Sequence, residues 1–203
     1  MRGDTKGRMV AGAADLIRRR GLNATSIREI VRHTGTPRGS VGHHFPRGKL
    51  QLVEEALAFA GNEAGQPLAL LVEAHGVRAG LRAFIAGWRK ILTDSAFEAG
   101  CPVLAVAVEE FIGEDGFPHA EGQARLLDMT RGIFGQWQDV LARGLTREGV
   151  ATERARRLAT LVIASVEGTV ALCRSSRSPQ ALDDVGQELE TFLAEAIAEG
   201  GGL

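Results

Sequence analysis

The sequence of 203 residues contains no tyrosine, only two cysteines and no apolar stretch long enough to cross a bilayer. Cys101 and Cys173 are 72 positions apart, which is neither a disulfide framework nor a metal-ligand spacing. The longest nearly uncharged run, residues 158–173, contains Glu167 and falls short of the roughly 20 residues that a spanning helix needs. The first residues are polar and lack an apolar signal segment. We therefore expect a cytoplasmic protein without a membrane partner.

What the chain does contain is an uneven distribution of charge. Through Lys49 there are eleven basic and three acidic residues, a net charge of +8, whereas the remainder has thirteen basic and twenty-two acidic residues, a net charge of −9. A basic segment on an acidic body suits a polyanionic partner that is held at one end of the protein. The alternative is an arginine-rich surface that is merely solvated.

Apolar residues of the N-terminal segment recur at helical spacing, which predicts short helices joined by tight turns. The first helix is expected over residues 5–20. Ser26 with Glu29 three residues later has the pattern of a capping box for a second helix over residues 27–33. Gly35 then supplies the turn.

A third helix is expected to follow directly, with Thr36 as its N-cap, Pro37 at its first position and its end near His44. A long fourth helix is expected to begin at Gly48 and Lys49, and Pro67 is expected to kink or interrupt it. Two short helices around a glycine turn, followed by a basic helix start, are the layout of a helix-turn-helix reader of DNA. A plain helical hairpin is the alternative.

The remaining residues are also predicted to be helical. Apolar stripes place helices around residues 77–92, from Cys101-Pro102 through Phe111, around 126–149, at 152–173 and at 178–199, with a loop at 113–118. The expected fold class is therefore all-α. It combines an N-terminal three-helix helix-turn-helix domain, residues 1–50, with a larger C-terminal helical domain, residues 51–203.

The chemistry of DNA recognition selects candidate contacts in the first segment. A recognition helix lies in the major groove with its first turns directed at base edges and phosphates. Arg38 can donate two hydrogen bonds to guanine or hold a phosphate, Val41 can touch a thymine methyl group, and Lys49 is expected to bind the DNA backbone. The predicted DNA-binding residues are Ser26, Thr36, Pro37, Arg38, Gly39, Ser40, Val41, His43, His44 and Lys49.

Residues 8–57 resemble the N-terminal domain of the tetracycline-repressor (TetR) family of transcriptional regulators. The matching residues are Thr25-Ser26-Ile27-Arg28-Glu29-Ile30, Gly35, Arg38-Gly39-Ser40-Val41, His44-Phe45, Lys49 and Leu52. The resemblance implies a homodimeric, all-helical repressor that releases its operator when a small molecule enters the C-terminal domain. The chain departs from the family at Gly42, where many members carry an aromatic residue, usually tyrosine.

A shorter match concerns residues 45–49 and 100–103, which are similar to a narrower subgroup of that family. Its members include repressors of multidrug-efflux genes and of flavonoid-responsive genes. Aromatic and apolar residues at helical spacing are candidates for an effector pocket, although plain core packing is equally consistent with them. The predicted effector-binding residues are Phe84, Trp88, Cys101, Glu109, Phe111, Met129, Ile133, Trp137 and Glu167, the two glutamates as polar anchors.

The run at residues 158–173 is apolar on more than one face, and Ala164 and Gly168 are four positions apart. Burial on both sides predicts packing against its own domain and against a second copy, together with the last helix. A buried helix inside a monomer is the alternative. The predicted dimer-interface residues are Leu158, Leu161, Val162, Ser165, Gly168, Thr169, Leu182, Leu189 and Phe192.

The expected function is a ligand-responsive transcriptional repressor. It would bind a near-palindromic double-stranded operator as a homodimer and be released by a small, largely apolar effector. There is no P-loop, dinucleotide-binding turn or nucleophile motif, and the adjacent His43 and His44 do not converge on a metal, so no enzyme, cofactor or metal is expected. The alternatives are a helical enzyme acting on a small apolar molecule and a DNA-binding protein without an effector.

Overall fold

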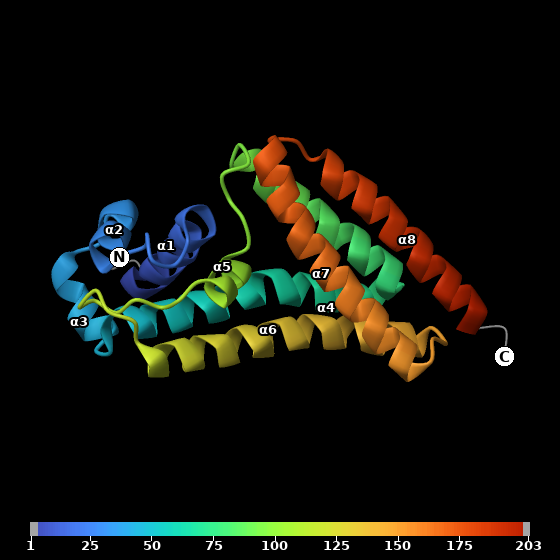
Figure 1. Ribbon diagram of the computed structural model, residues 1–203, viewed down its shortest axis with the longest axis horizontal. Helices are drawn as coiled ribbons and strands as arrows, with labels where there is room; N and C mark the ends of the chain where they lie inside the picture. Colours follow the sequence, from blue (N-terminus) through green and yellow to red (C-terminus); the bar gives the residue numbers. More distant parts are fainter. Residues whose placement is uncertain (1–3, 201–203) are drawn as a thin grey trace. The chain divides into compact units, whose positions relative to one another are not determined.

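The computed structural model describes residues 4–200, and within that range the chain is built from helices (Figure 1). An isolated antiparallel bridge between Ile112 and Pro118 is the one extended pairing in this part of the chain. The all-α fold class is confirmed. The elements are α1 (Thr5–Arg20), α2 (Ile27–Thr34), the 3-10 turn η1 (Arg38–Ser40), α3 (Val41–His44), α4 (Gly48–Asp94), α5 (Pro102–Val108), α6 (Ala120–Arg147), α7 (Thr152–Ser176) and α8 (Gln180–Gly200).

The chain forms two compact units, each built from separated segments. The first unit comprises the described residues up to Asn62 together with Cys101–Ile133, and the second comprises Glu63–Gly100 and the described residues from Phe134 onward. The helices α4 and α6 each supply one part to either unit. The predicted division at residue 50 separates the chain by position along the sequence and stays a prediction.

In the first unit, α1 packs against α2 and α5. The apolar face predicted for α1 is buried, and Asp4 caps the helix by accepting a hydrogen bond from the Gly7 amide at 2.8 Å. Burial of such a face supplies most of the stability of a helix of this length, because propensity alone is insufficient. The core side chains of this unit include Met9, Ala13, Ile17, Leu22, Ile30, Phe45, Leu52, Leu57 and Leu126.

In the second unit, α7 packs against α8 (Figure 1). The buried side chains of this unit include Val77, Leu81, Phe84, Leu92, Trp137, Leu141, Val162, Val166, Leu182 and Leu189. The apolar run at residues 158–173, expected to be too short to span a bilayer, lies within the longer helix α7. Among the described residues, α7 is the one helix whose length and apolar composition would suffice to cross a membrane, which corrects that expectation, and 44% of its most apolar window is buried inside the protein.

The predicted interruption of α4 at Pro67 is wrong, because the helix continues through that residue, and a kink without interruption stays a prediction. Pro67 lies inside α4, whereas the non-helical backbone is at Gly76, with φ 82° and ψ 171°. Glycine adopts this positive φ without the steric penalty that other residues pay. The next amide, that of Val77, is freed from the helix ladder and donates to the carboxylate of Glu148 at 2.7 Å. The break therefore occurs where the Glu148 carboxylate, one residue beyond the end of α6, replaces the lost backbone acceptor.

Two other expectations about local structure are corrected. The helix that begins at Pro102 ends at Val108, so Phe111 lies beyond it, on the segment that leads into the loop at residues 113–118. Glu109 has extended backbone angles, φ −101° and ψ 145°, because its side chain and carbonyl are engaged by other segments and not by the helix.

Candidate nucleic-acid interface

The turn between α2 and α3 is fixed by two local features. Ser26 Oγ accepts a hydrogen bond from the Glu29 amide at 3.3 Å, and the Glu29 carboxylate accepts from the Ser26 amide at 3.4 Å. This is the predicted capping box, which is confirmed. Gly35 ends α2 in the left-handed conformation, with φ 61°, and its amide donates to the carbonyl of Val31. The direction in which the chain leaves α2 is thus set by the sequence itself.

The third helix begins differently from the prediction. Thr36 is not its N-cap, because its buried hydroxyl group lies 2.8 Å from the hydroxyl of Thr34 and is shared with it. Pro37 has extended angles and is followed by the 3-10 turn η1 and only then by α3. Pro37 itself therefore takes the non-helical position before the first turn, and the helix begins later than predicted.

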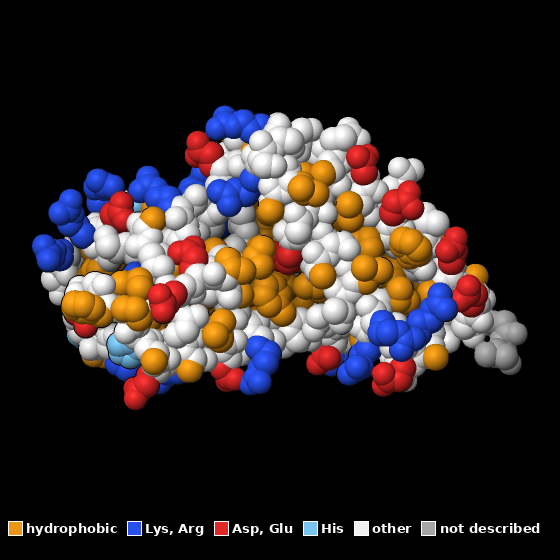
Figure 2. All heavy atoms as spheres, in the orientation of Figure 1, with side chains coloured by type: hydrophobic (Ala, Val, Ile, Leu, Met, Phe, Trp, Pro, Cys, Tyr) orange, Lys and Arg blue, Asp and Glu red, His pale blue; other side chains and the backbone are white. Residues whose placement is uncertain are grey.

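The predicted DNA-binding residues divide by exposure. Ser26, Pro37, Arg38, Gly39 and His43 are exposed, and Ser40 and His44 are half-buried, whereas Thr36, Val41 and Lys49 are buried. Within residues 4–200, the side chain of Arg38 makes no hydrogen bond or ion pair. Its guanidinium group is therefore available for an external acceptor. Figure 2 also shows lysine and arginine side chains gathered over α1 and α2.

The exposed side of η1 and α3 carries two glycines where contacts with DNA are expected. A Cβ atom added at Gly39 or at Gly42 would meet no atom within 4 Å. The missing aromatic side chain at Gly42 is therefore not a result of crowding inside the protein. A bare helix surface instead permits close approach of another backbone.

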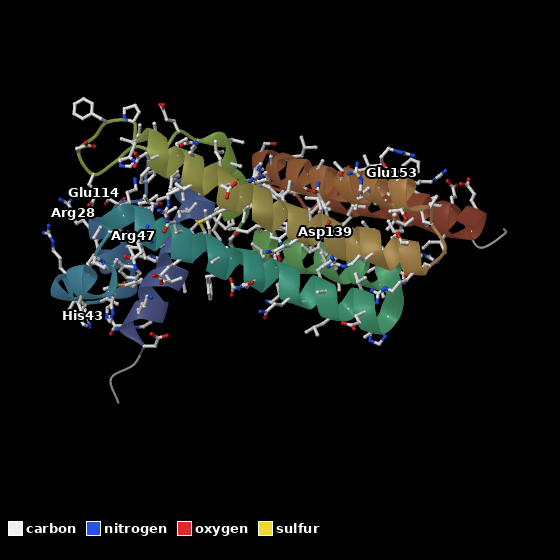
Figure 3. The ribbon with its side chains drawn as sticks, turned by 90° about the horizontal axis from the view of Figure 1, so that it is seen from below. Arg28, His43, Arg47, Glu114, Asp139 and Glu153 are labelled. Atoms are coloured by element: carbon white, nitrogen blue, oxygen red, sulfur yellow. The ribbon has the colours of Figure 1, made fainter. Side chains whose placement is uncertain are left out.

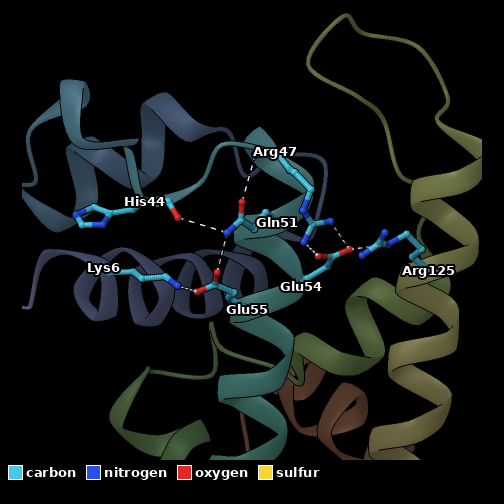
Figure 4. Close-up of polar contacts among 7 residues, drawn as sticks. All are labelled: Lys6, His44, Arg47, Gln51, Glu54, Glu55 and Arg125. Carbon is cyan, nitrogen blue, oxygen red and sulfur yellow. Dashed lines mark hydrogen bonds and ion pairs between the residues drawn. The ribbon is translucent and has the colours of Figure 1, made fainter. Parts of the chain in front are cut away.

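The end of α3 and the residues that follow it are held by side chains from the first turns of α4 (Figure 4). The side-chain amide of Gln51 donates to the carbonyl of His44 at 3.3 Å and to the carboxylate of Glu55 at 3.0 Å, and its oxygen accepts from the Arg47 amide at 3.2 Å. The ammonium group of Lys6 lies 2.8 Å from the Glu55 carboxylate. Partial burial favours the neutral form of Glu55, but the hydrogen bonds from Lys6 and Gln51 outweigh it and hold its pKa below the usual value.

A second carboxylate on α4 joins two further segments. The buried Glu54 accepts from Arg47 at 2.7 Å and from Arg125 of α6 at 2.8 Å (Figure 4). The hydrogen bond and charge of Glu54 raise the pKa of the Arg47 guanidinium. One carboxylate thus connects the segment after α3 with α6.

Lys49, predicted to grip the DNA backbone, is only 7% exposed. Its Nζ donates to the carbonyl of Ile112 at 3.4 Å and lies 5.5 Å from the centre of the Phe111 ring. Burial lowers the pKa of the ammonium group, and the nearby charges of Glu114 and Glu109 oppose that shift. The structure therefore directs this cation into the first unit.

Of the predicted effector-binding residues, four lie in the second unit. The rings of Phe84 and Trp88 are 6.3 Å apart, and those of Phe84 and Trp137 are 6.1 Å apart, both in edge-on arrangements. The Nε1 of Trp88 is buried and has no hydrogen-bond partner among the described residues. Glu167 is buried on α7. These residues stay candidates for an effector site.

The other five predicted effector residues lie in the first unit, and three of them have structural contacts there. Cys101 Sγ accepts from the Leu104 amide at 3.4 Å. The Glu109 carboxylate accepts from the amides of Leu22 and Asn23 at 3.0 and 3.1 Å. The buried Phe111 packs its ring edge-on to His119. Met129 is half-buried and Ile133 is buried.

Two surface cavities of the second unit have arginines in their walls and include none of the predicted effector residues. One, of about 640 Å³, lies between α4 and α8 and contains Arg78, Arg82 and Arg89. The other, of about 670 Å³, is lined by α4, α6 and α7 and contains Arg143, Arg147 and Arg156. No group of three or more metal-ligating side chains exists within residues 4–200.

The predicted dimer-interface residues on α7 and α8 are of two kinds. Leu161, Gly168 and Phe192 are exposed, and Leu158 and Ser165 are half-buried. Val162, Thr169, Leu182 and Leu189 are buried within the second unit itself.

Sequence reasoning missed Asn23, Gln51 and Glu54. Asn23 donates to the Glu110 carbonyl at 2.6 Å and accepts from the Ile112 amide at 3.1 Å, across 87 and 89 positions of sequence. No local pattern signals such partners. For Glu54, the signal was its place among apolar neighbours on the buried face of α4.

Comparison with known proteins identifies the family. A model of bacterial regulatory proteins of the tetR family matches residues 9–56, and a model of the LmrA/YxaF-like C-terminal domain of transcriptional regulators matches residues 78–188. The uncharacterized HTH-type transcriptional regulator Rv0196 of Mycobacterium tuberculosis (strain ATCC 25618 / H37Rv) is 37% identical over 95% of both chains. The HTH-type transcriptional regulator LmrA of Bacillus subtilis (strain 168) is 27% identical over 87% of this chain and 89% of its own.

The fold has counterparts among solved structures. A TetR transcriptional regulator from Legionella pneumophila superposes with a TM-score of 0.79 at 21% identity, covering 95% of this chain and 99% of that one. The predicted resemblance to the TetR family, and the helix-turn-helix at its N-terminus, are confirmed. The chain belongs to the tetR family of bacterial DNA-binding transcriptional regulators, with a C-terminal domain of the LmrA/YxaF-like type.

Proposed function

We propose that this regulator is a repressor that binds a near-palindromic operator as a homodimer and releases it when a small, largely apolar effector binds. The exposed, arginine-bearing surface of η1 and α3 is the observation that carries the proposal. Arg38 is exposed and free of internal partners within the described residues, and Gly39 and Gly42 leave the helix surface open beside it. A guanidinium group in this position suits bidentate contact with guanine. Such a DNA partner also implies the cytoplasm as the site of action.

The arrangement of α2 supplies further cations for the DNA backbone. Arg28 and Arg32 are exposed on that helix, and Arg28 lies in its first turn (Figure 3). Contacts of this kind position a protein on the duplex without reading sequence. Specificity would then depend mainly on Arg38, Ser40 and His43.

An exposed apolar surface on α7 and α8 supports the proposed homodimer. Leu161, Leu172 and Phe192 are 45%, 57% and 50% exposed, and Figure 2 shows hydrophobic side chains over these two helices. Gly168 lies on the same stripe of α7 as Leu161 and Leu172, and a Cβ added there would meet no atom within 4 Å. Surfaces of this kind mark sites of association, and a dimer would present two recognition helices to half-sites one helical turn apart.

The aromatic cluster of the second unit supports the effector part of the proposal. Phe84, Trp88 and Trp137 supply apolar ring surface, and the buried N–H of Trp88 lacks an acceptor within residues 4–200. A buried indole N–H normally has a partner. We therefore expect an effector that combines an aromatic or aliphatic body with an oxygen acceptor for Trp88.

Operator binding is tested by a gel-shift titration with the DNA upstream of the protein's own gene. The proposal predicts a discrete complex that competes with random duplex of equal length and weakens steeply as salt increases. Retention that random duplex removes equally well would contradict specific recognition.

Effector binding can be followed by intrinsic fluorescence, because the chain has two tryptophans and no tyrosine. Small aromatic compounds that bind should quench this emission, raise Tm and displace the operator. Trp88→Phe keeps an aromatic ring but removes the N–H, so it should weaken binding of an oxygen-bearing compound more than of its hydrocarbon analogue. A protein whose DNA complex no compound affects would instead be a regulator without an effector, and turnover of a bound compound would indicate an enzyme.

A further inference from the structure

The segment at residues 112–118, here called the 112–118 hairpin, has a defined shape. Ile112 and Pro118 form an antiparallel bridge, and the Gly113 amide donates to the Phe117 carbonyl at 2.9 Å. The Asp115 carboxylate accepts from the Phe117 amide at 3.1 Å. Gly116 adopts a φ of 85°, which closes the turn. The hairpin is therefore a small folded element that can hold its side chains in fixed positions.

The strand that enters the hairpin is tied to the loop between α1 and α2. The side chain of Asn23 contacts the Glu110 carbonyl and the Ile112 amide, at 2.6 and 3.1 Å. The Glu109 carboxylate accepts from the amides of Leu22 and Asn23, and Gln123 of α6 accepts from the Phe111 amide. These contacts fix the hairpin beside the helix-turn-helix.

The hairpin covers the start of α4. Its Ile112 carbonyl accepts from Lys49 Nζ at 3.4 Å, and a carboxylate oxygen of Glu114 lies only 2.8 Å from the position that a Cβ on Gly48 would occupy. Gly48 and Lys49 are the first two residues of α4. Figure 3 shows Glu114 at the same end of the molecule as Arg28 and Arg47.

The first turn of a long helix with a lysine beside it attracts anions, because unpaired amides and the helix dipole add to the ammonium charge. A DNA phosphate is one such anion, and the carboxylate of Glu114 is another. The hairpin places its Glu114 carboxylate beside Gly48 and its Ile112 carbonyl at the Lys49 ammonium group. The two ligands cannot occupy the same position at the same time.

We propose that the 112–118 hairpin is an intramolecular competitor of the DNA backbone, which holds the start of α4 and Lys49 closed until a phosphate displaces it. The inference rests on the DNA-binding function of the helix-turn-helix. Lys49 is buried in the closed state, and the polar contacts of its ammonium group with the described residues are one long hydrogen bond and one aromatic ring. Desolvation opposes its charge in that place, so exchange of these contacts for a phosphate and water costs little.

The first experiment compares two substitutions that remove the same charge. Glu114→Gln removes the carboxylate at Gly48, whereas Glu110→Gln removes an exposed carboxylate just before the hairpin. Binding is measured by fluorescence anisotropy with a 30-base-pair duplex from the upstream DNA, over a series of salt concentrations, and both variants are checked for unchanged Tm. The Kd of Glu114→Gln for the duplex should be roughly 2- to 5-fold lower than that of Glu110→Gln. Equal effects of the two variants would overturn the inference.

The second experiment asks whether the gain depends on Lys49. In a double-mutant cycle, Glu114→Gln is combined with Lys49→Met, which keeps the apolar stem but removes the ammonium group. The gain from Glu114→Gln should fall by at least half in the Lys49→Met background, and the salt dependence of log K should lose about one phosphate contact. An undiminished gain would show that the carboxylate acts only by general repulsion of DNA, which contradicts the proposed closure.

A third measurement observes the hairpin directly in the wild-type protein. Hydrogen exchange followed by mass spectrometry should show faster exchange for the peptide containing residues 111–119 when the duplex is bound, while peptides from α2 and α3 become protected. Unchanged or slower exchange of residues 111–119 would overturn the inference. If neither the wild type nor any variant binds a duplex, the proposed function fails and this inference fails with it, whereas binding with an unmoved hairpin removes the inference alone.

Discussion

The two compact units differ in where they place polar and apolar groups. The first unit buries charged side chains and satisfies them across long sequence distances, as with Lys49 and Ile112 or Glu54 and Arg125. The second unit also buries one charged residue, Glu167, but it exposes Leu161, Leu172 and Phe192 on the packed pair α7 and α8. The large apolar side chains that the first unit exposes, Val108, Phe117 and Leu127, lie instead on three separate segments. Buried polar contacts fix geometry, because each unsatisfied group would carry a large cost. Burial of exposed apolar area on association supplies binding free energy that depends little on the orientation of the contacting groups.

This difference matches two separate demands on the proposed DNA-binding dimer. The surface that contacts DNA, formed by η1 and α3, must hold Arg38 in one orientation. Gln51 and Glu54 of α4 fix this surface through their contacts with His44 and Arg47. The association surface needs a self-complementary patch, which small and apolar side chains on two packed helices provide. Substitutions in the two units should therefore fail in different ways.

The largest effect is expected from Gly168→Arg. A Cβ at this position meets no atom of the same chain within 4 Å, so the monomer should fold normally. A charged side chain in the centre of the α7 stripe should prevent dimerisation. A monomer presents one helix-turn-helix to the operator instead of two, so operator affinity should fall by at least ~100-fold. Analytical ultracentrifugation and anisotropy measure the two quantities on one sample.

Gly168→Ala is the matched control, and it should preserve the dimer and stabilise α7 by roughly 1 kcal/mol, because alanine is the better helix former. A Gly168→Arg protein that remained dimeric would remove this face from the association surface and with it the proposed contrast between the units.

The next effect concerns the reading surface alone. Arg38→Ala should weaken operator binding by about 1–3 kcal/mol if its guanidinium reads a guanine, while leaving the oligomeric state and Tm unchanged. Arg147→Ala, at an exposed position of α6, removes the same charge from the second unit and should change affinity little. Equal losses in specific and random duplex would make Arg38 a phosphate contact.

Glu109→Gln tests whether this residue belongs to the fold of the first unit or to an effector site. Its carboxylate accepts from two backbone amides, so we expect unfolding free energy to fall by about 1–3 kcal/mol, which lowers Tm by several degrees. Tryptophan quenching by an effector should keep its midpoint. A weakened effector with an unchanged Tm would instead support the role as polar anchor, and Glu110→Gln controls for charge.

Sequence patterns predicted those features whose causes are local. The capping box of Ser26 and Glu29, the left-handed Gly35 and the start of α4 each depend on residues within one turn of the helix. The apolar periodicity of α7 likewise predicted a helix that faces both inward and outward. The prediction failed at Thr36, where two local signals competed. Its sequence position is that of an N-cap, but its hydroxyl group is hydrogen-bonded to the hydroxyl of Thr34.

The remaining features depend on partners far along the chain. Lys49 has the sequence context of a phosphate contact, yet its carbonyl acceptor is 63 positions away, on the 112–118 hairpin. In the same way, Pro67 is the stronger helix breaker by composition, but the break lies at Gly76 because the Glu148 carboxylate accepts from the freed amide of Val77. A single sequence contains no signal for such pairs.

A smaller effect is expected from Ser26→Ala at the start of α2. The substitution removes one half of the capping box, so stability should fall by about 1 kcal/mol. Because α2 carries exposed Arg28 and Arg32, fraying of its first turn should weaken operator and random duplex alike. Thermal unfolding and anisotropy with both duplexes measure this, and Ser26→Asp, which restores an acceptor, should recover most of the loss. If Ser26→Ala instead lowered the affinity for operator but not for random duplex, Ser26 would contact a base directly.

The smallest effect is a pH dependence of the contacts around Gln51. The pKa of Glu55 is lowered in the folded state, so its contribution to stability is complete above its ordinary value of 4.5 and is lost as pH falls through the lower, folded value. Glu55→Gln should therefore lower Tm slightly at pH 7, by an amount typical of partly exposed ion pairs, and the two proteins should converge in stability once the pH lies below the lowered, folded pKa of Glu55. Lys6→Met should reproduce this convergence, because it removes the cation that binds Glu55. If the difference in Tm between Glu55→Gln and the wild type were instead the same at every acidic pH, the charge of Glu55 would contribute nothing to stability. Its side chain would then act only as a hydrogen-bond partner of Gln51, and Gln51 alone would hold α3 in place.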